Sequence, residues 1–164
     1  MSVRLYIRHL PPGLPKREAE RIAARELAGE AGVGEIHHTD TGAPIVRMPG
    51  VYISISHNRD TCILAVSDTP VGVDIETPRP TLAKTITRVS STDESGIDPL
   101  HLWTAKEAVF KCAGIRDMTI PEVTVSPTLR TATARGLIFN LQYQTLGDAL
   151  VCTAQRYLTL HGKH

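Results

Sequence analysis

Apolar and polar residues follow two different spacings along the chain, and each spacing predicts a different element. Over residues 16–32 the apolar positions recur every three or four residues, which is the spacing of an amphipathic helix. The same spacing predicts a second helix over residues 99–113, with Asp98 as its cap, Pro99 at the first helical position and Gly114 at its end. A shorter helix is expected over residues 82–89.

Strands are expected where short apolar runs are bounded by turn residues. These runs cover residues 4–8, 51–56, 61–67, 71–76, 122–125, 136–144 and 149–155, and residues 91–94 are expected to form a polar turn. Short turns separate the three runs between residues 51 and 76, which predicts that they pair as an antiparallel meander. Such turns argue against a doubly wound parallel sheet, so we expect an α+β fold.

Composition and charge narrow the classes of partner. The chain has 164 residues, of which 41% are hydrophobic, and this suits one packed unit. Its 18 Lys and Arg are balanced by 17 Asp and Glu, so we expect neither nucleic acid nor a membrane surface as the main partner. No apolar run approaches the roughly 20 residues of a membrane span, and basic residues interrupt the first ten positions. Three widely spaced cysteines suggest reduced thiols, and we expect a cytoplasmic protein.

Two carboxylates share one face of the strand predicted at residues 71–76. Alternation along a strand sends Gly72, Asp74 and Glu76 to the same side. The carboxylates then lie roughly 6–7 Å apart, and a hard divalent cation between them would offset their repulsion. Gly72 is expected to leave room beside them for a ligand. An Asp-x-Glu pair is more often a solvated strand end, so the pair alone does not assign a metal site.

The helix predicted at residues 99–113 carries aromatic residues on the face opposite its apolar stripe. Trp103 and Phe110 flank Glu107 there, with Lys106 and Lys111 alongside. A carboxylate flanked by aromatic rings is partly desolvated, which raises its affinity for a proton or a cation. Glu107 is therefore a candidate metal ligand or base. The alternative is a surface ion pair between Glu107 and Lys111 at i, i+4, and the spacing does not decide between the two.

Polar side chains gather where the strand at residues 51–56 ends. Ser56 and Asn58 can hydrogen-bond an anion, and His57 adds positive charge when it is protonated, so this end is a candidate phosphate site. A polar hairpin turn without a ligand is the alternative. A Ser–His nucleophile and base is disfavoured, because neighbours on an extended chain point to opposite sides.

Four segments resemble, in this order, the signatures of the 4'-phosphopantetheinyl transferase superfamily. They are TGAP at residues 41–44, ISISH at 53–57, VGVDIE at 71–76 and HLWTAKEAVFK at 101–111. The last two together are highly specific, and the resemblance spans residues 16–114 with a looser match beyond. The chain is similar to the type that activates peptide and polyketide synthetases rather than to the short trimeric holo-carrier-protein synthases.

The resemblance implies a fold of two pseudo-symmetric halves, each a small antiparallel sheet packed with helices, with coenzyme A between them. The boundary would fall near Pro70. Residues 1–70 would form a shortened N-terminal half and residues 71–164 a C-terminal half with the metal site, together one compact unit and a monomer.

The resemblance also implies an activity. It is the magnesium-dependent transfer of 4'-phosphopantetheine from coenzyme A to a serine of an apo acyl or peptidyl carrier protein, with release of 3',5'-ADP. This is the activity of a holo-[acyl-carrier-protein] synthase. The alternative is a degenerate relative that binds coenzyme A or a carrier protein without transferring anything.

The implied roles divide between a metal end and a nucleotide end. Magnesium would be held by Asp74, Glu76 and Glu107. Glu107 is the first candidate for the base, Glu76 the second, and Lys111 would contact the phosphates. The residues expected to bind coenzyme A are Ser56, His57, Lys111, Pro44, Arg17 and Arg21.

Three departures from the family pattern concern the nucleotide end. The chain is shorter at its N-terminus than the two-half relatives, where these carry further basic residues. Ala43 stands where the turn at residues 42–44 usually has Lys, and Asn58 replaces a common serine. A basic stripe on the helix at residues 16–32 is either an ordinary solvated face or a replacement for the lost contacts. It consists of Arg17, Arg21 and Arg25.

Overall fold

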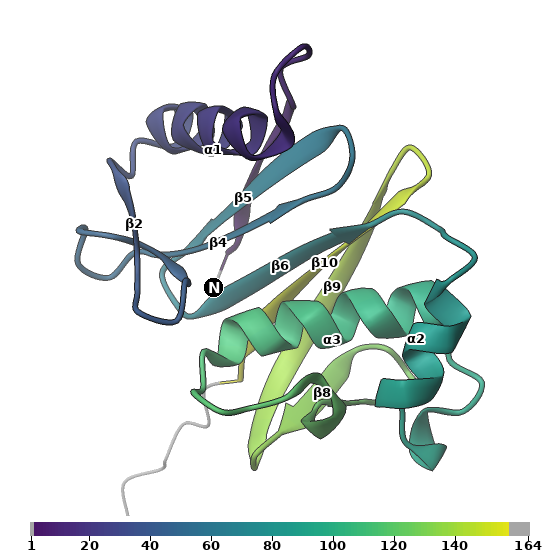
Figure 1. Cartoon of the computed structure of the whole chain (residues 1–164). Coiled ribbons are helices and arrows are strands. Elements are labelled where there is room, and N and C mark those ends of the chain that lie inside the picture. Colours follow the sequence, from purple (N-terminus) through teal and green to yellow (C-terminus); the bar gives the residue numbers. More distant parts are fainter. Residues whose placement is uncertain (1, 158–164) are drawn as a thin grey trace, which may run out of the picture.

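The computed structural model describes residues 2–157 of the chain (Figure 1). The α-helices are α1 (Lys16–Ala31), α2 (Leu82–Val89) and α3 (Pro99–Ala113), and two 3₁₀ turns are η1 (Thr92–Glu94) and η2 (Ile120–Glu122). The first strands are β1 (Arg4–His9), β2 (Ile36–His38), β3 (Pro44–Val46), β4 (Tyr52–His57) and β5 (Thr61–Ser67). They are followed by β6 (Val71–Glu76), β7 (Thr124–Val125), β8 (Thr131–Ala134), β9 (Leu137–Leu146) and β10 (Ala149–Arg156).

The strands form two main sheets and a small hairpin. The first sheet has the order β1-β5-β4, the second has the order β6-β10-β9-β8-β7, and β2 pairs with β3. All of these pairs are antiparallel. In Figure 1, α1 lies over the first sheet and α3 over the second. The predicted α+β fold is therefore confirmed, while the division into halves at residue 70 stays a prediction, although the chain passes from one sheet to the other there.

The predicted meander is wrong at its third strand. β4 and β5 pair as expected, but β6 leaves them and pairs with β10, with Val73 opposite Thr153. A strand has only two edges, and β5 already has β1 on one side and β4 on the other. The pattern also did not indicate the short strands β2, β3 and β8. Of the strand expected at residues 122–125, only Thr124–Val125 pairs as a strand.

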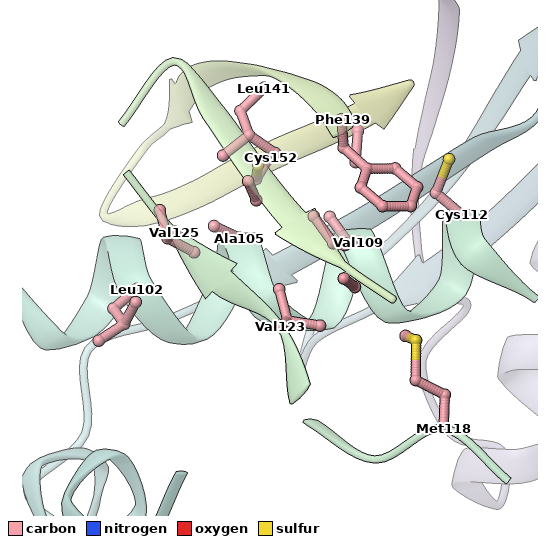
Figure 2. Packing of buried hydrophobic residues seen from close by; sticks show 14 of the residues in the cluster. Leu102, Ala105, Val109, Cys112, Met118, Val123, Val125, Phe139, Leu141 and Cys152 are labelled. Atoms are coloured by element: carbon pink, nitrogen blue, oxygen red, sulfur yellow. The ribbon is translucent and has the colours of Figure 1, made fainter. Parts of the chain in front are cut away.

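Three apolar clusters hold the layers together. α1 packs on the first sheet through a cluster that includes Ala23 and Leu27. Figure 2 shows the second cluster, in which Leu102, Ala105 and Val109 of α3 face the second sheet. A third cluster lies between the two sheets and joins Ile63 and Ala65 of β5 to the following residues of β6 and β10: Val71, Val73, Ile75 and Val151. The alternation of β6 therefore turns its aliphatic residues toward the first sheet and leaves its other face for α3.

Local signals at the ends of α3 explain why its bounds match the prediction. The Asp98 side chain accepts a hydrogen bond from the backbone N–H of His101 at 3.1 Å, and Pro99 occupies the first turn. Gly114 ends the helix in the left-handed conformation with φ of 56°.

In residues 2–157 no helix is both long and apolar enough to cross a membrane.

Gly72 does not leave room for a ligand, contrary to the prediction. A Cβ atom at this position would lie 1.9 Å from the carbonyl oxygen of Ala108 and 2.6 Å from the backbone nitrogen of Cys112. The missing side chain instead allows the backbone of α3 to pack directly on β6. The glycine therefore sets the distance between the helix and the strand that carry the predicted carboxylates.

Gly72→Ala is expected to lower the free energy of unfolding by about 3 kcal/mol, because the added methyl group meets backbone that cannot rotate away. Urea denaturation of both proteins measures this difference. Gly29→Ala in α1 is the control, since a Cβ there meets no atom within 4 Å, and we expect it to be neutral or slightly stabilising. Equal stability of Gly72→Ala and the unaltered chain would contradict the packing argument.

Candidate functional site

The two sheets meet where β4 runs beside β6, and serine hydroxyls bridge this seam. The backbone N–H of Val73 donates to Ser54 Oγ at 3.0 Å, and that of Ile75 donates to Ser56 Oγ at 3.2 Å. Both serines are buried. Side chains of alternate β4 residues thus satisfy the outer edge of β6, where a paired strand would otherwise supply carbonyl groups.

Asp74 is buried in this seam, with 5% of its surface exposed. Its Oδ1 atom accepts hydrogen bonds from Ser56 Oγ at 3.0 Å and from Lys111 Nζ at 2.9 Å. Its Oδ2 atom is buried and has no hydrogen-bond partner among the described residues. Burial raises the pKa of Asp74 to about 7; Lys111 acts in the opposite direction, and the nearby Glu76 and Glu107 carboxylates add to the increase.

The ammonium of Lys111 on α3 contacts residues of β6 and does not pair with Glu107 of its own helix. Its ammonium donates to the Val73 carbonyl at 3.0 Å as well as to Asp74. In residues 2–157 no ion pair joins Glu107 to Lys111, so the surface-pair alternative is not formed. Burial raises the pKa of Glu107, with Lys111 opposing the change, and this is the direction that the sequence pattern predicts for the carboxylate.

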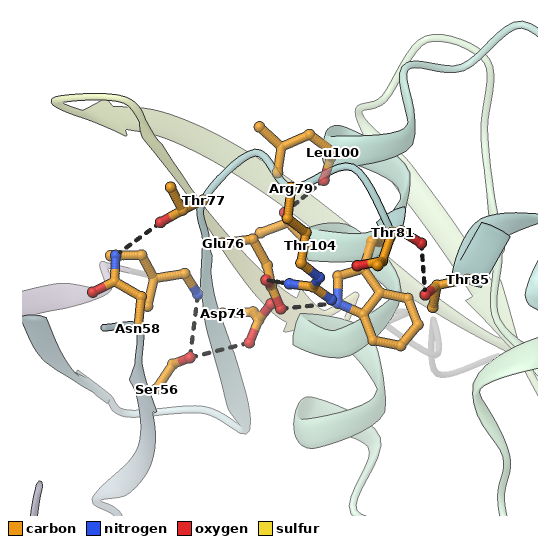
Figure 3. Close-up of polar contacts among 12 residues, drawn as sticks. Ser56, Asn58, Asp74, Glu76, Thr77, Arg79, Thr81, Thr85, Leu100 and Thr104 are labelled. Atoms are coloured by element: carbon orange, nitrogen blue, oxygen red, sulfur yellow. Dashed lines mark hydrogen bonds and ion pairs between the residues drawn. The ribbon is translucent and has the colours of Figure 1, made fainter. Parts of the chain in front are cut away.

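Glu76 is held by two donors at the end of β6. Trp103 Nε1 of α3 donates to Oε1 at 2.8 Å, and Arg79 donates to Oε2 at 2.6 Å; Figure 3 shows the pair formed by Arg79 and Glu76. The aromatic residue on the second face of α3 therefore has a specific polar partner. Both oxygens of Glu76 are engaged.

The three carboxylates predicted as metal ligands come from β6 and α3 and influence one another electrostatically. As the side chains stand, no three His, Cys, Asp or Glu groups in the described part of the chain are close enough to hold an ion. Their chemistry fits a hard divalent cation, because all donors are oxygens and Asp74 presents a buried oxygen that has no partner within residues 2–157. Glu76 would have to release Arg79 or Trp103 before it could join them.

Four of the six residues predicted to bind coenzyme A line one groove of about 1140 Å³. It runs between α1 and the β2–β3 hairpin, and these four residues are Arg17, Arg21, Pro44 and His57. Arg25, the third residue of the basic stripe, also lines it. The other two predicted residues, Ser56 and Lys111, lie in the seam instead.

His57 and Ser56 turn to opposite sides of β4. His57 Nδ1 lies 3.0 Å from a carboxylate oxygen of Glu20 on α1, whereas the Ser56 hydroxyl contacts Asp74 and Ile75. Burial lowers the pKa of His57, and Glu20 opposes this effect. The Ser–His nucleophile alternative is not formed, because the serine hydroxyl faces away from the imidazole.

A second groove of about 940 Å³ lies along the ends of β1, β6 and β9. Its lining includes Lys16, Asn58, Glu76 and Arg79. The sequence pattern did not single out Arg79 or Lys16. The available signal for Arg79 was a basic residue three positions after Glu76, where the chain leaves β6.

Comparison with known proteins finds a curated relative of this chain. No family model matches the chain. A curated protein, the 4'-phosphopantetheinyl transferase psf-1 of Bacillus pumilus, is 37% identical over 119 residues, which cover 56% of this chain and 51% of that protein. The chain therefore spans about half the length of this relative. The match confirms the resemblance to the 4'-phosphopantetheinyl transferase superfamily that the four segments indicate.

Proposed function

We propose that this chain transfers the 4'-phosphopantetheine group of coenzyme A to a serine of an apo carrier protein, with magnesium and with release of 3',5'-ADP. The observation that carries the proposal is the position of Asp74 beside Lys111, where it offers a buried oxygen that no other described residue contacts by a hydrogen bond. A basic groove of ligand-cleft size, about 1140 Å³, adjoins this point through His57. The similarity to a protein named as a 4'-phosphopantetheinyl transferase supports the same function.

The residues at the metal end have separable tasks. Asp74, Glu107 and a released Glu76 would hold magnesium, which would supply positive charge against the diphosphate of coenzyme A. Lys111, with 30% of its side chain exposed, brings a positive charge to the same place. Glu107 is the first candidate for the group that accepts the proton of the carrier serine, and burial raises its pKa in the metal-free protein. Glu76 is the second.

The proposed transfer forms one bond to phosphorus, breaks another and moves one proton. The serine oxygen bonds to the phosphorus on the pantetheine side, the bond from that phosphorus to the oxygen of 3',5'-ADP breaks, and the serine proton passes to the carboxylate. Positioning and charge stabilisation supply most of the rate in phosphoryl transfer.

Coenzyme A as substrate and the three buried free cysteines favour a cytoplasmic protein.

Mass spectrometry of an intact carrier protein tests the activity. We expect apo carrier proteins incubated with the chain, coenzyme A and magnesium to gain the mass of one phosphopantetheine group. Glu107→Gln is expected to lower the rate at least about 100-fold, since it removes a candidate ligand and base. No mass gain with any of several fatty-acid, polyketide and peptide-synthetase carriers would reject the enzyme.

A non-catalytic binder is the second candidate, and the engagement of both Glu76 oxygens favours it. Calorimetric titration of coenzyme A separates the two functions. Binding of coenzyme A without any carrier modification would support the binder.

The basic groove is expected to bind the 3',5'-ADP part of coenzyme A. Arg17→Ala together with Arg21→Ala should raise KM for coenzyme A about tenfold or more and leave kcat within about twofold, because phosphate contacts far from the reacting atoms contribute uniform binding. Arg88→Ala on α2 is the matched control, since this exposed arginine lies outside the groove lining. Unchanged KM in the double variant would leave the arginines as a solvated helix face.

A further inference from the structure

We infer that Ser56 is a positioning residue, which holds the Asp74 carboxylate in the orientation that receives a divalent cation, and that it does not bind the 3'-phosphate of coenzyme A. This inference rests on the proposed function and assigns Ser56 to the metal end of the site. It differs from the role that the sequence resemblance implies for the same residue.

The Ser56 hydroxyl is engaged by hydrogen bonds within the seam. A hydroxyl has one O–H to donate. In Ser56 it is directed to Asp74 Oδ1 at 3.0 Å, while its oxygen accepts the backbone N–H of Ile75 at 3.2 Å. The residue is 5% exposed. A phosphate contact would require the hydroxyl to abandon Asp74 inside a buried seam.

The two oxygens of Asp74 have different surroundings. Ser56 and Lys111 both donate to Oδ1, which fixes the rotation of the carboxylate. Oδ2 is then the oxygen that has no partner in the described part of the chain. Outer partners that orient a ligand typically contribute 10–100-fold to metal affinity. Because Ser56 belongs to β4 and Asp74 to β6, the contact also spans the two sheets.

Two adjacent residues of β4 face different parts of the site. His57, the next residue, points to Glu20 and lines the basic groove. Neighbours on a strand face opposite sides, so one residue of β4 serves the nucleotide groove and the preceding one serves the carboxylate. The two ends of the site are thus tied to adjacent positions of a single strand.

Manganese binding followed by electron paramagnetic resonance tests the inference without turnover. Mn²⁺ is a suitable probe because, like Mg²⁺, it prefers oxygen ligands. Ser56→Ala is expected to weaken Mn²⁺ binding about 10–100-fold. Ser56→Thr, which keeps the hydroxyl, should restore most of the affinity. If Ser56→Ala folds poorly, Ser56→Cys takes its place, because a thiol fills a similar volume and is a weaker hydrogen-bond donor. Ser56→Cys is also expected to weaken Mn²⁺ binding.

Ser54→Ala is the matched control. Ser54 is buried in the same strand and accepts the N–H of Val73 across the same seam, at 3.0 Å. Its hydroxyl has no contact with Asp74 among the described hydrogen bonds. Ser54→Ala should therefore lose about as much thermal stability as Ser56→Ala. Its affinity for Mn²⁺ should stay within about twofold of that of the unaltered chain. Equal weakening in both serine variants would mean that the seam alone matters and would overturn the inference.

A pair of substrates distinguishes positioning from phosphate binding. If Ser56 positions Asp74, Ser56→Ala lowers kcat/KM for coenzyme A and for 3'-dephospho-coenzyme A by the same factor, and the preference between them persists. If Ser56 binds the 3'-phosphate, that preference shrinks. Unchanged Mn²⁺ affinity in Ser56→Ala, or no Mn²⁺ binding by the unaltered chain, would overturn the inference. Mn²⁺ binding that depends on Ser56 in a chain that modifies no carrier would reject the proposed function alone.

Discussion

Replacing Lys106 with methionine is expected to lower the free energy of unfolding by about 3–5 kcal/mol, because it leaves a buried carboxylate without its cation. The side chains of Lys106 and Glu94 are both fully buried, and Lys106 Nζ lies 2.9 Å from Glu94 Oε1. The ammonium also donates to the carbonyl of Val123. Lys106 of α3 therefore contacts η1 through Glu94 and the residue before β7 through Val123.

The remaining oxygen contacts of Glu94 explain why the loss should be large. Oε1 accepts the N–H of Val125 at 2.7 Å, and Oε2 accepts the N–H of Ser91 at 2.8 Å. These two donors are dipoles rather than charges, so they do not replace the ammonium of Lys106. Removing both charges is much less costly than removing one.

Urea denaturation of three variants measures this effect. Lys106→Met should be strongly destabilised, and the double variant Lys106→Met with Glu94→Gln should recover a large part of the loss, which is the signature of a coupled pair. Lys84→Met on α2 is the control, because this lysine is exposed, and it should stay within about 0.5 kcal/mol of the unaltered chain. A loss below about 1 kcal/mol in Lys106→Met would contradict the prediction.

The same residues show where the sequence pattern was insufficient. Helical spacing places Lys106 on the polar side of α3, and residues 91–94 have the composition of a polar turn. In the structure both charged groups are buried, because η1 and β7 pack on that side of the helix. Opposite charges 12 positions apart in sequence do not reveal that they will share one interior site.

Elements with local signals were predictable to the residue. α3 has a cap, a proline at its start and a glycine at its end, and β5 and β6 are apolar runs bounded by turns. The partner of β6 was not predictable, since β10 is more than 70 positions away and both strands are apolar. A glycine inside a strand indicates that a ligand or another backbone approaches closely, and the sequence of β6 does not say that here it is the backbone of α3.

The candidate site shows a similar division. Strand alternation placed Asp74 and Glu76 on one face, and the aromatic residues around Glu107 indicated its desolvation. Spacing did not indicate that Ser56 and Lys111 would share one oxygen of Asp74, since these contacts join residues 18 and 37 positions apart. The metal and its ligand set stay predictions.

Asp74→Asn is expected to change stability and activity in opposite directions. Burial raises the pKa of the Asp74 carboxyl from 3.8 to about 7, so between these pH values the folded protein holds a proton that the unfolded chain has released. The free energy of unfolding of the unaltered chain therefore falls as the pH rises through this window. Asparagine cannot ionise, and without divalent cations Asp74→Asn should be more stable at pH 8 by about 2 kcal/mol, with little difference at pH 4.

The expected loss of function follows from the same burial. The buried charge of Asp74 destabilises the folded chain when no cation is bound, and a bound cation offsets this cost. Added Mg²⁺ should therefore raise the Tm of the unaltered chain and leave that of Asp74→Asn unchanged. Carrier modification by the variant should fall at least about 100-fold. Asp93→Asn, at an exposed position, is the control and should change none of these quantities. If Asp74→Asn were less stable than the unaltered chain at pH 8, the carboxylate would be holding the seam together rather than being held there to bind a cation.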